Sequence, residues 1–203
     1  MPRRSNARRG PPGSVRIIAG EWRGRRIPIV DEADVRPTPD RVRETVFNWL
    51  REPLVGARCL DLFAGTGALG FEALSRGAAE VAFCESAARV AAELRATLDR
   101  FGLAATARVI GQPAEQALKQ LQGPFDVAFL DPPFDAGLLA PALHALARQG
   151  LLAADAAVYV EMPAREALPP LPAGWRQHRE GKAGEVGYHL LTAAATAAPT
   201  ESP

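Results

Sequence analysis

The stretch FLDPPF, from Phe129 to Phe134, ends an apolar run with an acid, two prolines and an aromatic ring. Proline has no backbone donor and disfavours helix in the residue before it, so this segment holds a carboxylate and a ring stiffly side by side. The Asp131 carboxylate and the Pro132 carbonyl can accept both N–H bonds of an exocyclic amine, which frees the nitrogen lone pair for attack. Phe134 can stack on an extruded nucleobase. The alternative is a rigid turn that ends a strand, with an incidental acid.

A glycine-rich turn lies upstream in LDLFAGTGALG, residues 60–70, between an apolar run and a helical pattern. Its glycines at 65, 67 and 70 have the GxGxxG spacing, which permits a tight turn and lets the backbone approach a ligand closely. Glu85 follows the next apolar run, twenty residues after Gly65, where a carboxylate can accept both hydroxyls of a ribose. The combination predicts a cofactor of the nucleotide type.

Three ligands compete for such a turn. A triphosphate is disfavoured, because no Lys-Ser/Thr follows the loop as a P-loop requires. A dinucleotide and S-adenosylmethionine fit the glycines and Glu85 equally well. S-adenosylmethionine also explains Asp61, four residues before Gly65, whose carboxylate can hold the cationic amino group of the methionine moiety. The alternative for Asp61 is a local turn or a helix-end contact.

Alternating strands and helices are needed to position these residues. Apolar runs predict strands at 58–63, 80–86, 106–111, 125–131 and 157–162, with helices near 67–76, 87–101, 113–122 and 137–149. This alternation predicts an α/β fold with a doubly wound, mostly parallel sheet, whose carboxyl edge is where ligands bind. Residues 175–192 predict a final hairpin, which adds antiparallel strands at one edge and brings the sheet to seven strands.

The N-terminal part has a different pattern. Residues 14–30 alternate in polarity around a glycine-containing turn and predict a β-hairpin, and a helix follows it. In that helix Thr38 is the expected cap and Pro39 fits the first turn, while apolar residues from Val42 to Leu50 recur at helical spacing.

Composition narrows the class of protein. The chain has 203 residues, of which 47% are hydrophobic and 23% charged, as in ordinary globular proteins. We expect a cytoplasmic protein without a membrane partner, because no apolar run is long enough to span a bilayer and the N-terminus lacks a secretory pattern. Residues 1–26 contain eight arginines and one acid, which suggests a polyanionic partner. We expect Cys59 and Cys84 to be buried core residues, because each lies in a short apolar run and they form no CxxC pair. The three histidines are scattered without ligand spacing, so no metal site is predicted.

Several motifs together resemble a known family. The stretches RIIAGEWRGRRIPIV, RPTPDRVRETVFNWL, LDLFAGTGALGFEALSRGA and FLDPPF are similar to those of the bacterial 16S rRNA guanine-N2 methyltransferases, which belong to the class I S-adenosylmethionine-dependent enzymes. The resemblance extends from Val15 to about Leu191. It implies a Rossmann-like methyltransferase fold and transfer of methyl groups to the N2 amine of one guanine in 16S rRNA, within the 30S subunit or its assembly intermediate. We expect a monomer that uses S-adenosylmethionine, yields S-adenosylhomocysteine and needs no metal.

The resemblance also divides the chain into parts. It implies a hairpin and helix at 14–52 that pack on the core and a methyltransferase domain at 53–192. Outside it, composition predicts a basic disordered tail at 1–13, rich in Arg, Pro and Gly, and a second disordered tail of small and polar residues at 193–203.

Site residues are carried over by position, and their predicted roles fall into three groups. The expected cofactor-binding residues are Asp61, Phe63, Gly65, Thr66, Gly67, Glu85, Ser86 and Gln112, with Arg36 and Thr38 closing over the cofactor. The expected catalytic residues are Asp131, Pro132 and Phe134. The basic arm, rather than the family, predicts RNA-binding residues at Arg16, Arg23, Arg25 and Arg26, and the alternative is that these arginines only solvate an exposed hairpin. Gln112 stands between Gly111 and Pro113, where many relatives have Asp or Asn followed by Ala, so the adenine contact is open. Glu161 and Lys182 match family positions without an assigned role.

Three alternatives stay open on the sequence alone. DPPF also occurs in enzymes that methylate other nucleobase amines, such as adenine N6 in DNA or RNA. A nicotinamide-dependent oxidoreductase would explain the glycines and Glu85, but it would leave Asp61, DPPF and the basic arm unexplained. An RNA-binding assembly factor would bind the 30S particle without turnover.

Overall fold

The computed structural model describes residues 13–30 and 38–193. Nearly all of the two predicted tails, and Arg36, lie outside the described residues. The strands of the main sheet are β3 (Arg58–Asp61), β4 (Glu80–Cys84), β5 (Ala107–Ile110), β6 (Phe125–Leu130), β7 (Leu152–Pro163), β8 (Arg176–Ala183) and β9 (Val186–Thr192). The helices are α1 (Asp40–Trp49), α2 (Ala68–Ser75), α3 (Ala88–Phe101), α4 (Ala114–Leu118) and α5 (Leu139–Arg148), with a 3-10 turn η1 at Phe134–Ala136.

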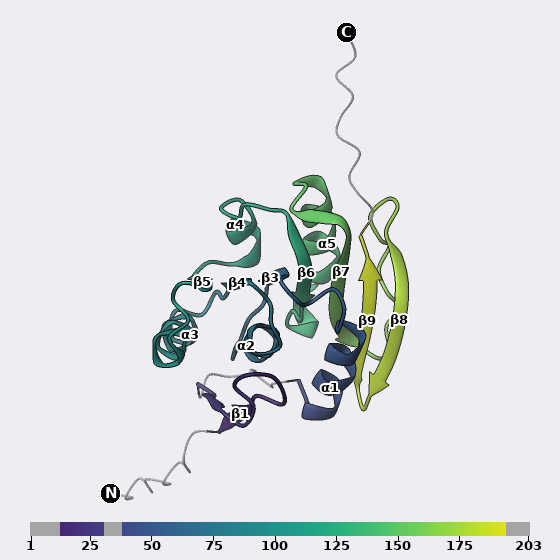
Figure 1. Cartoon of the computed structure of the whole chain (residues 1–203). Coiled ribbons are helices and arrows are strands. Elements are labelled where there is room, and N and C mark those ends of the chain that lie inside the picture. Colours follow the sequence, from purple (N-terminus) through teal and green to yellow (C-terminus); the bar gives the residue numbers. More distant parts are fainter. Residues whose placement is uncertain (1–12, 31–37, 194–203) are drawn as a thin grey trace, which may run out of the picture.

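The main sheet has seven strands in the order β5-β4-β3-β6-β7-β9-β8 (Figure 1). The first five strands in this order, from β5 through β4, β3 and β6 to β7, are parallel to one another, whereas β9 runs antiparallel to both β7 and β8. The strand order reverses between the parallel neighbours β3 and β6, because the chain adds β4 and β5 on one side of β3 and then β6 and β7 on the other. Such a switch point opens a crevice at the carboxyl ends of the strands. The predicted α/β class, the mostly parallel sheet and the final hairpin are confirmed.

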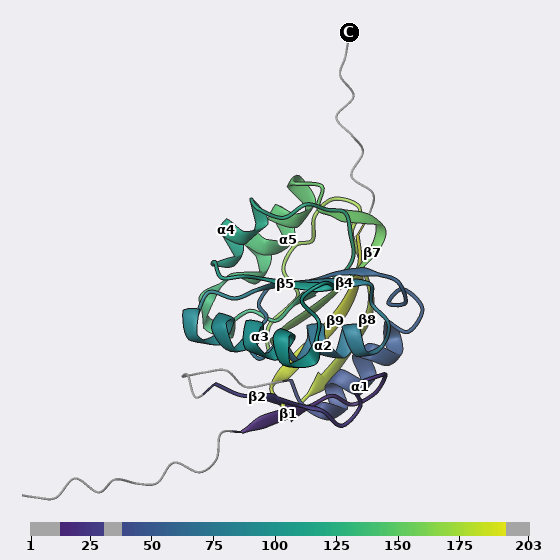
Figure 2. The ribbon, with the colours of Figure 1, turned by 60° about the vertical axis from the view of Figure 1, so that its left-hand side comes forward.

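Helices cover both faces of this sheet. Figure 2 shows α4 and α5 on one side and α1, α2 and α3 on the other. Alternate residues of each strand serve the two layers: Leu60 and Val160 pack with α4 and α5, while Cys59 and Tyr159 pack with the other three helices. This alternation follows because successive side chains of a strand point to opposite faces of the sheet. Cys59 and Cys84 are both buried free thiols, as predicted.

The predicted N-terminal hairpin is present as β1 (Ser14–Arg16) and β2 (Arg26–Pro28), which pair antiparallel. Its Ile17 and Ile27 are buried in the same apolar cluster as Val46 and Phe47 of α1. The hairpin therefore lies outside the α1–α2 layer and is tied to it by packing (Figure 2). None of the helices among residues 13–30 and 38–193 has the length and apolar character of a transmembrane span.

The predicted cap of α1 is wrong. The helix starts at Asp40, Pro39 occupies the N-cap position, and no side chain caps the helix. The Thr38 hydroxyl instead donates to Glu161 Oε1 at 2.7 Å. Thr38 lies one residue before the N-cap position, and its hydroxyl is held by donation to a buried carboxylate, a charge-assisted hydrogen bond.

Candidate active site

Polar residues follow the carboxyl ends of five neighbouring strands. Asp61 ends β3, Glu85 and Asp131 directly follow β4 and β6, Gln112 lies two residues after β5, and Glu161 lies near the end of β7. Because the five strands are parallel, the structure brings these residues to one edge of the sheet. This is the ligand-binding edge of a doubly wound fold.

The glycine turn is closed by the acid after β4. Gly65 and Gly67 have φ values of 51° and 77°, a left-handed conformation that glycine adopts without a steric penalty. The Glu85 carboxylate accepts the Gly65 N–H at 2.9 Å and the Ala87 N–H at 2.7 Å. A carboxylate offers about four lone-pair sites, so Glu85 keeps capacity for further donors such as ribose hydroxyls.

Asp61 is a buried acid, only 2% exposed. Its Oδ2 accepts the Gly70 N–H in the first turn of α2 at 3.0 Å, so the helix-end contact considered as an alternative is present. Burial raises the pKa of Asp61 to about 7, and the negative charge of Glu85 contributes in the same direction. The hydrogen bond occupies one carboxylate oxygen. The role of Asp61 toward a cofactor stays a prediction.

Asp131 and Glu161 are neighbours at the ends of β6 and β7. Leu130 pairs with Val160, so the next residues of the two strands lie side by side. Both follow residues whose side chains pack with α4 and α5, and they therefore point to the opposite face, toward α1. Glu161 Oε1 accepts the hydroxyls of Thr38 at 2.7 Å and Tyr159 at 2.8 Å.

The carboxylates of Asp61, Asp131 and Glu161 repel one another at this edge of the sheet. Burial raises the pKa of Asp131 well above its usual range, and the charges of Glu161 and Asp61 raise it further. Burial also raises the pKa of Glu161, while the two hydroxyl donors act against that shift. The site is therefore short of positive charge, and a cationic ligand would relieve the repulsion.

The rest of the DPPF motif reaches the surface. Pro132 is buried, whereas Phe134 is 39% exposed at the start of η1. An exposed ring close to a partly buried acid suits the predicted stacking on a base. Of the other predicted cofactor residues, Thr66 is buried, Phe63 and Gln112 are half-buried, and Ser86 is exposed.

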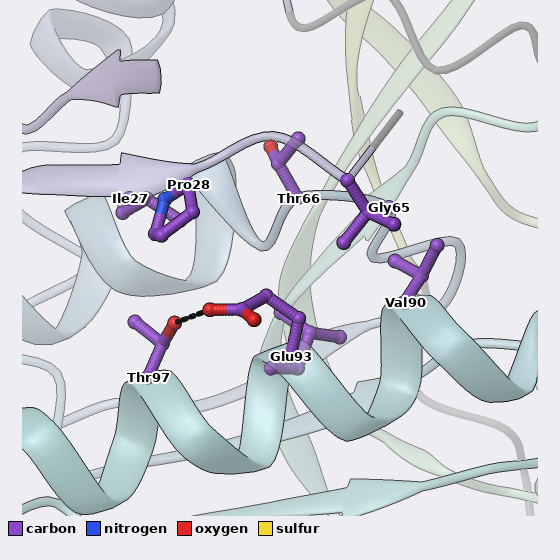
Figure 3. A pocket seen from close by; sticks show the side chains of 9 residues that line it. Ile27, Pro28, Gly65, Thr66, Val90, Glu93 and Thr97 are labelled. Atoms are coloured by element: carbon purple, nitrogen blue, oxygen red, sulfur yellow. Dashed lines mark hydrogen bonds between the residues drawn. The ribbon is translucent and has the colours of Figure 1, made fainter. Parts of the chain in front are cut away.

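Two hollows adjoin the hairpin. The first lies between β2, the glycine turn and α3, where Pro28, Thr66 and Val90 face one another and Thr97 bonds Glu93 at 3.4 Å (Figure 3). The lining of this hollow includes neither Asp61 nor Asp131, so the hollow is separate from the acids at the carboxyl edge of the sheet. The second is a groove of about 340 Å³ between the hairpin and the start of α1, with Arg26 and Thr38 in its lining.

The four predicted RNA-binding arginines are exposed on the hairpin. Arg16 lies 3.5 Å from Asp40, Arg26 donates to Ser14 Oγ at 2.9 Å, and Arg25 lies 5.2 Å from the ring centroid of Phe101. Surface contacts of this kind are weak and leave the guanidinium groups available to phosphates.

Sequence reasoning missed a buried ionic cluster beneath the hairpin. Arg43 of α1 and Glu72 of α2 are both fully buried. The Glu72 carboxylate accepts the backbone N–H groups of Ile18 and Ala19 at 2.7 and 3.0 Å, and it pairs with Arg76 at 2.7 Å. A signal was available: Arg43 stands on the apolar stripe of its helix, at the spacing i, i+3, i+4 and i+7 of three buried residues.

Within the part of the chain that the structure describes, no three His, Cys, Asp or Glu side chains are grouped so that they could hold a metal ion.

The strand order, the antiparallel β9, and the glycine turn with its acid partner define a class I methyltransferase fold. The chain belongs to the family described as "Conserved hypothetical protein 95", whose model matches residues 15–192. "Ribosomal RNA small subunit methyltransferase D" of Escherichia coli (strain K12) is 47% identical over 178 residues, 88% of this chain and 89% of that protein. The protein of the same name from Haemophilus influenzae is 44% identical over 181 residues, 88% of this chain and 93% of that protein.

A solved structure supports the same assignment. "Putative methyltransferase yhhF from Escherichia coli" has a TM-score of 0.84 and 45% identity, covering 90% of this chain and 99% of that chain. The predicted family and the predicted methyltransferase fold are confirmed.

Proposed function

We propose that this protein transfers a methyl group from S-adenosylmethionine to the exocyclic N2 amine of a guanine in 16S rRNA of the small ribosomal subunit. The observation that carries the proposal is the partly buried Asp131 carboxylate that follows β6, beside Glu161, in a member of this family. The relatives named as small-subunit rRNA methyltransferases support the substrate class.

The charge of the site favours this cofactor over a dinucleotide. Three carboxylates with raised pKa values meet at one edge: Asp61 and Glu161 are buried, and Asp131 is partly buried. S-adenosylmethionine carries a sulfonium and an ammonium group, which such a site would attract. A dinucleotide carries a pyrophosphate, which the same carboxylates would repel.

The residues present fit the cofactor along its length. Asp61 would hold the ammonium group, Glu85 the ribose hydroxyls and Gln112 the adenine side of the pocket. The left-handed Gly65 and Gly67 bring backbone close to the ligand at the N-terminus of α2. When bound, the cofactor supplies an activated methyl group.

The DPPF motif would then activate the amine. The Asp131 carboxylate and the Pro132 carbonyl accept the two N–H bonds, so the nitrogen lone pair is less delocalised into the base. The nitrogen would form a bond to the methyl carbon while the bond from that carbon to sulfur breaks, so that S-adenosylhomocysteine leaves as a neutral thioether. The nitrogen would also give up one proton, which Asp131 would accept. The prolines keep these acceptors fixed, so little reorganisation accompanies the transition state. Phe134 stacks on the extruded base.

The rRNA would be bound by the hairpin arginines. Arg16, Arg23, Arg25 and Arg26 are exposed on one element, where they would contact phosphates and orient the strand without reading its sequence. We propose that the protein acts in the cytoplasm as a monomer on the 30S particle or its assembly intermediate.

A methylation assay tests the proposal. Purified protein, labelled S-adenosylmethionine and 30S subunits from a strain lacking the modification are combined, and modified nucleotides are mapped by mass spectrometry. We expect one N2-methylguanine in 16S rRNA. Methylation at adenine N6 would favour the alternative base. Binding to subunits without turnover would favour the assembly factor. Tight NAD binding without S-adenosylhomocysteine binding would favour the oxidoreductase.

A further inference from the structure

We propose that Glu161 is the residue that selects guanine over adenine, by accepting the N1–H of the target base while Asp131 accepts from its exocyclic amine. This inference rests on the proposed function and extends it to the choice of base. It concerns a side chain to which the sequence analysis assigned no role.

The placement of Glu161 suits this contact. It follows Val160, the register partner of Leu130, and so lies beside Asp131 on the adjacent parallel strand and points to the same face. An exocyclic amine and the neighbouring ring nitrogen are adjacent on the edge of a guanine. Two neighbouring carboxylates can therefore meet both groups of one base.

The side chain is fixed before any base arrives. Glu161 is 3% exposed, and its Oε1 accepts two hydroxyls, from Thr38 before α1 and from Tyr159 on the same strand. The Tyr159 ring is itself packed, with its centroid 6.4 Å from that of Phe129. These contacts hold the carboxyl group of Glu161 in one orientation. Both hydroxyls donate to Oε1, and neither donates to Oε2. A fixed acceptor favours a donor at one position of the base.

The two hydroxyls also favour the ionised form of Glu161. Both donate to the carboxylate, and both act against the rise of its pKa that burial causes. An ionised carboxylate accepts hydrogen bonds and donates none.

That property separates the two purines. Guanine has a hydrogen on N1, which Glu161 would accept. Adenine has no hydrogen on N1. The lone pair of that nitrogen would face the Glu161 carboxylate, so two hydrogen-bond acceptors would repel each other with no donor between them. Sites built around a hydrogen bond discriminate strongly against analogues that lack the donor.

The experiment uses 30S subunits reconstituted with 16S rRNA in which 2-aminopurine replaces the mapped target guanine. This base keeps the 2-amine and has no hydrogen on N1. For the native protein we expect kcat/KM on 2-aminopurine to fall roughly 100-fold or more relative to guanine, since a buried acceptor is left unpaired. For Glu161→Gln the ratio should shrink to about 10-fold or less, because the amide can donate to the bare N1.

Two further variants complete the test. Glu166→Gln makes the same chemical change at an exposed acid after β7 and should keep the native ratio. Tyr159→Phe removes one hydroxyl that orients Glu161 and should give an intermediate ratio, which is measurable even where Glu161→Gln turns over too slowly. S-adenosylhomocysteine affinity, measured by calorimetry, should be unchanged in all three.

An unchanged ratio in both Glu161→Gln and Tyr159→Phe would overturn this inference and leave the proposed function intact. Absence of methylation on guanine-bearing subunits by the native protein would instead overturn the proposed function, and the inference with it.

Discussion

Arg43 and Glu72 form an ion pair between α1 and α2 in which neither side chain is exposed, with Arg43 Nη1 3.6 Å from Glu72 Oε2. Arg43 also donates to the backbone carbonyls of Arg16 at 3.0 Å and Thr38 at 3.2 Å. One guanidinium thus joins the hairpin, the start of α1 and helix α2. Because Thr38 bonds Glu161, the same group also supports the edge of the candidate active site.

We expect Arg43→Met to be strongly destabilising. Removing one partner of a buried pair leaves the other charge uncompensated, at a cost of about 3–5 kcal/mol in the free energy of unfolding. Urea denaturation followed by circular dichroism measures this. The retained Arg76 contact of Glu72 places the expected loss toward the lower end of that range.

Arg100→Met is the matched control. Its partner Glu93 lies 2.9 Å away, and the two side chains are 47% and 32% exposed. An exposed pair contributes about 0–1 kcal/mol, so the loss should be small. Similar losses in the two variants would contradict the role given to Arg43.

The sequence predicted the elements better than their side-chain partners. The apolar runs ending at Asp61, Glu85 and Asp131 predicted strands, and parallel pairing then placed those acids at one edge. Local periodicity is enough for that, because side-chain alternation along a strand sets which residues are buried. The N-terminal hairpin was predicted from the same kind of pattern.

The contacts of Thr38 and Arg43 could not be predicted in this way. Thr38 bonds a residue 123 positions away, and a cap to its own helix was the better local prediction. The partners of Arg43 lie on the hairpin and on α2, so its burial depends on how three elements pack. Only its position on an apolar stripe marked it as unusual.

Asp61→Asn should make the protein without cofactor more stable at pH 8 than the native one. The folded pKa of about 7 lies above the ordinary pKa of 3.8 for an aspartate, so the folded state binds more protons between these values and stability falls as pH rises through them. Each unit between the two pKa values corresponds to about 1.4 kcal/mol. Urea unfolding at pH 4 and pH 8 measures the difference between the two proteins.

The same substitution should weaken the cofactor. Asparagine keeps an acceptor for Gly70 but loses the charge that we propose binds the ammonium group, so S-adenosylhomocysteine affinity should fall about 10-fold or more, as for a charged hydrogen bond. A variant that is more stable at pH 8 and binds the ligand as tightly as the native protein would show that Asp61 serves the helix end alone.

Asp131→Asn should abolish turnover and leave S-adenosylhomocysteine binding largely intact. The amide keeps the shape of the side chain but replaces one acceptor oxygen by a donor, so it no longer grips the amine. Radiolabel transfer to 30S subunits measures turnover and calorimetry measures binding. Equal loss of both would mean that Asp131 belongs to the cofactor pocket.

The pH profile gives an independent reading of Asp131. Its pKa is raised by burial and then by Glu161, so kcat/KM should be lost on acidification well above the range of an ordinary aspartate. Glu161→Gln removes the neighbouring charge and should move this acid limb to lower pH. If the acid limb of the kcat/KM profile stays at the same pH in Glu161→Gln, the charge of Glu161 does not raise the pKa of Asp131.

Arg23→Ala should weaken binding to 30S subunits without changing stability. Arg23 is exposed between the hairpin strands, whereas its neighbour Arg25 stacks over Phe101 and supports packing as well. Loss of one phosphate contact should reduce the slope of log affinity against log salt by about one, uniformly across RNA sequences. Filter binding at several salt concentrations measures the slope.

Arg148→Ala, at the end of α5 on the opposite face of the sheet, is the control and should leave the slope unchanged. Equal effects of the two substitutions would mean that the hairpin is not the surface that meets the RNA.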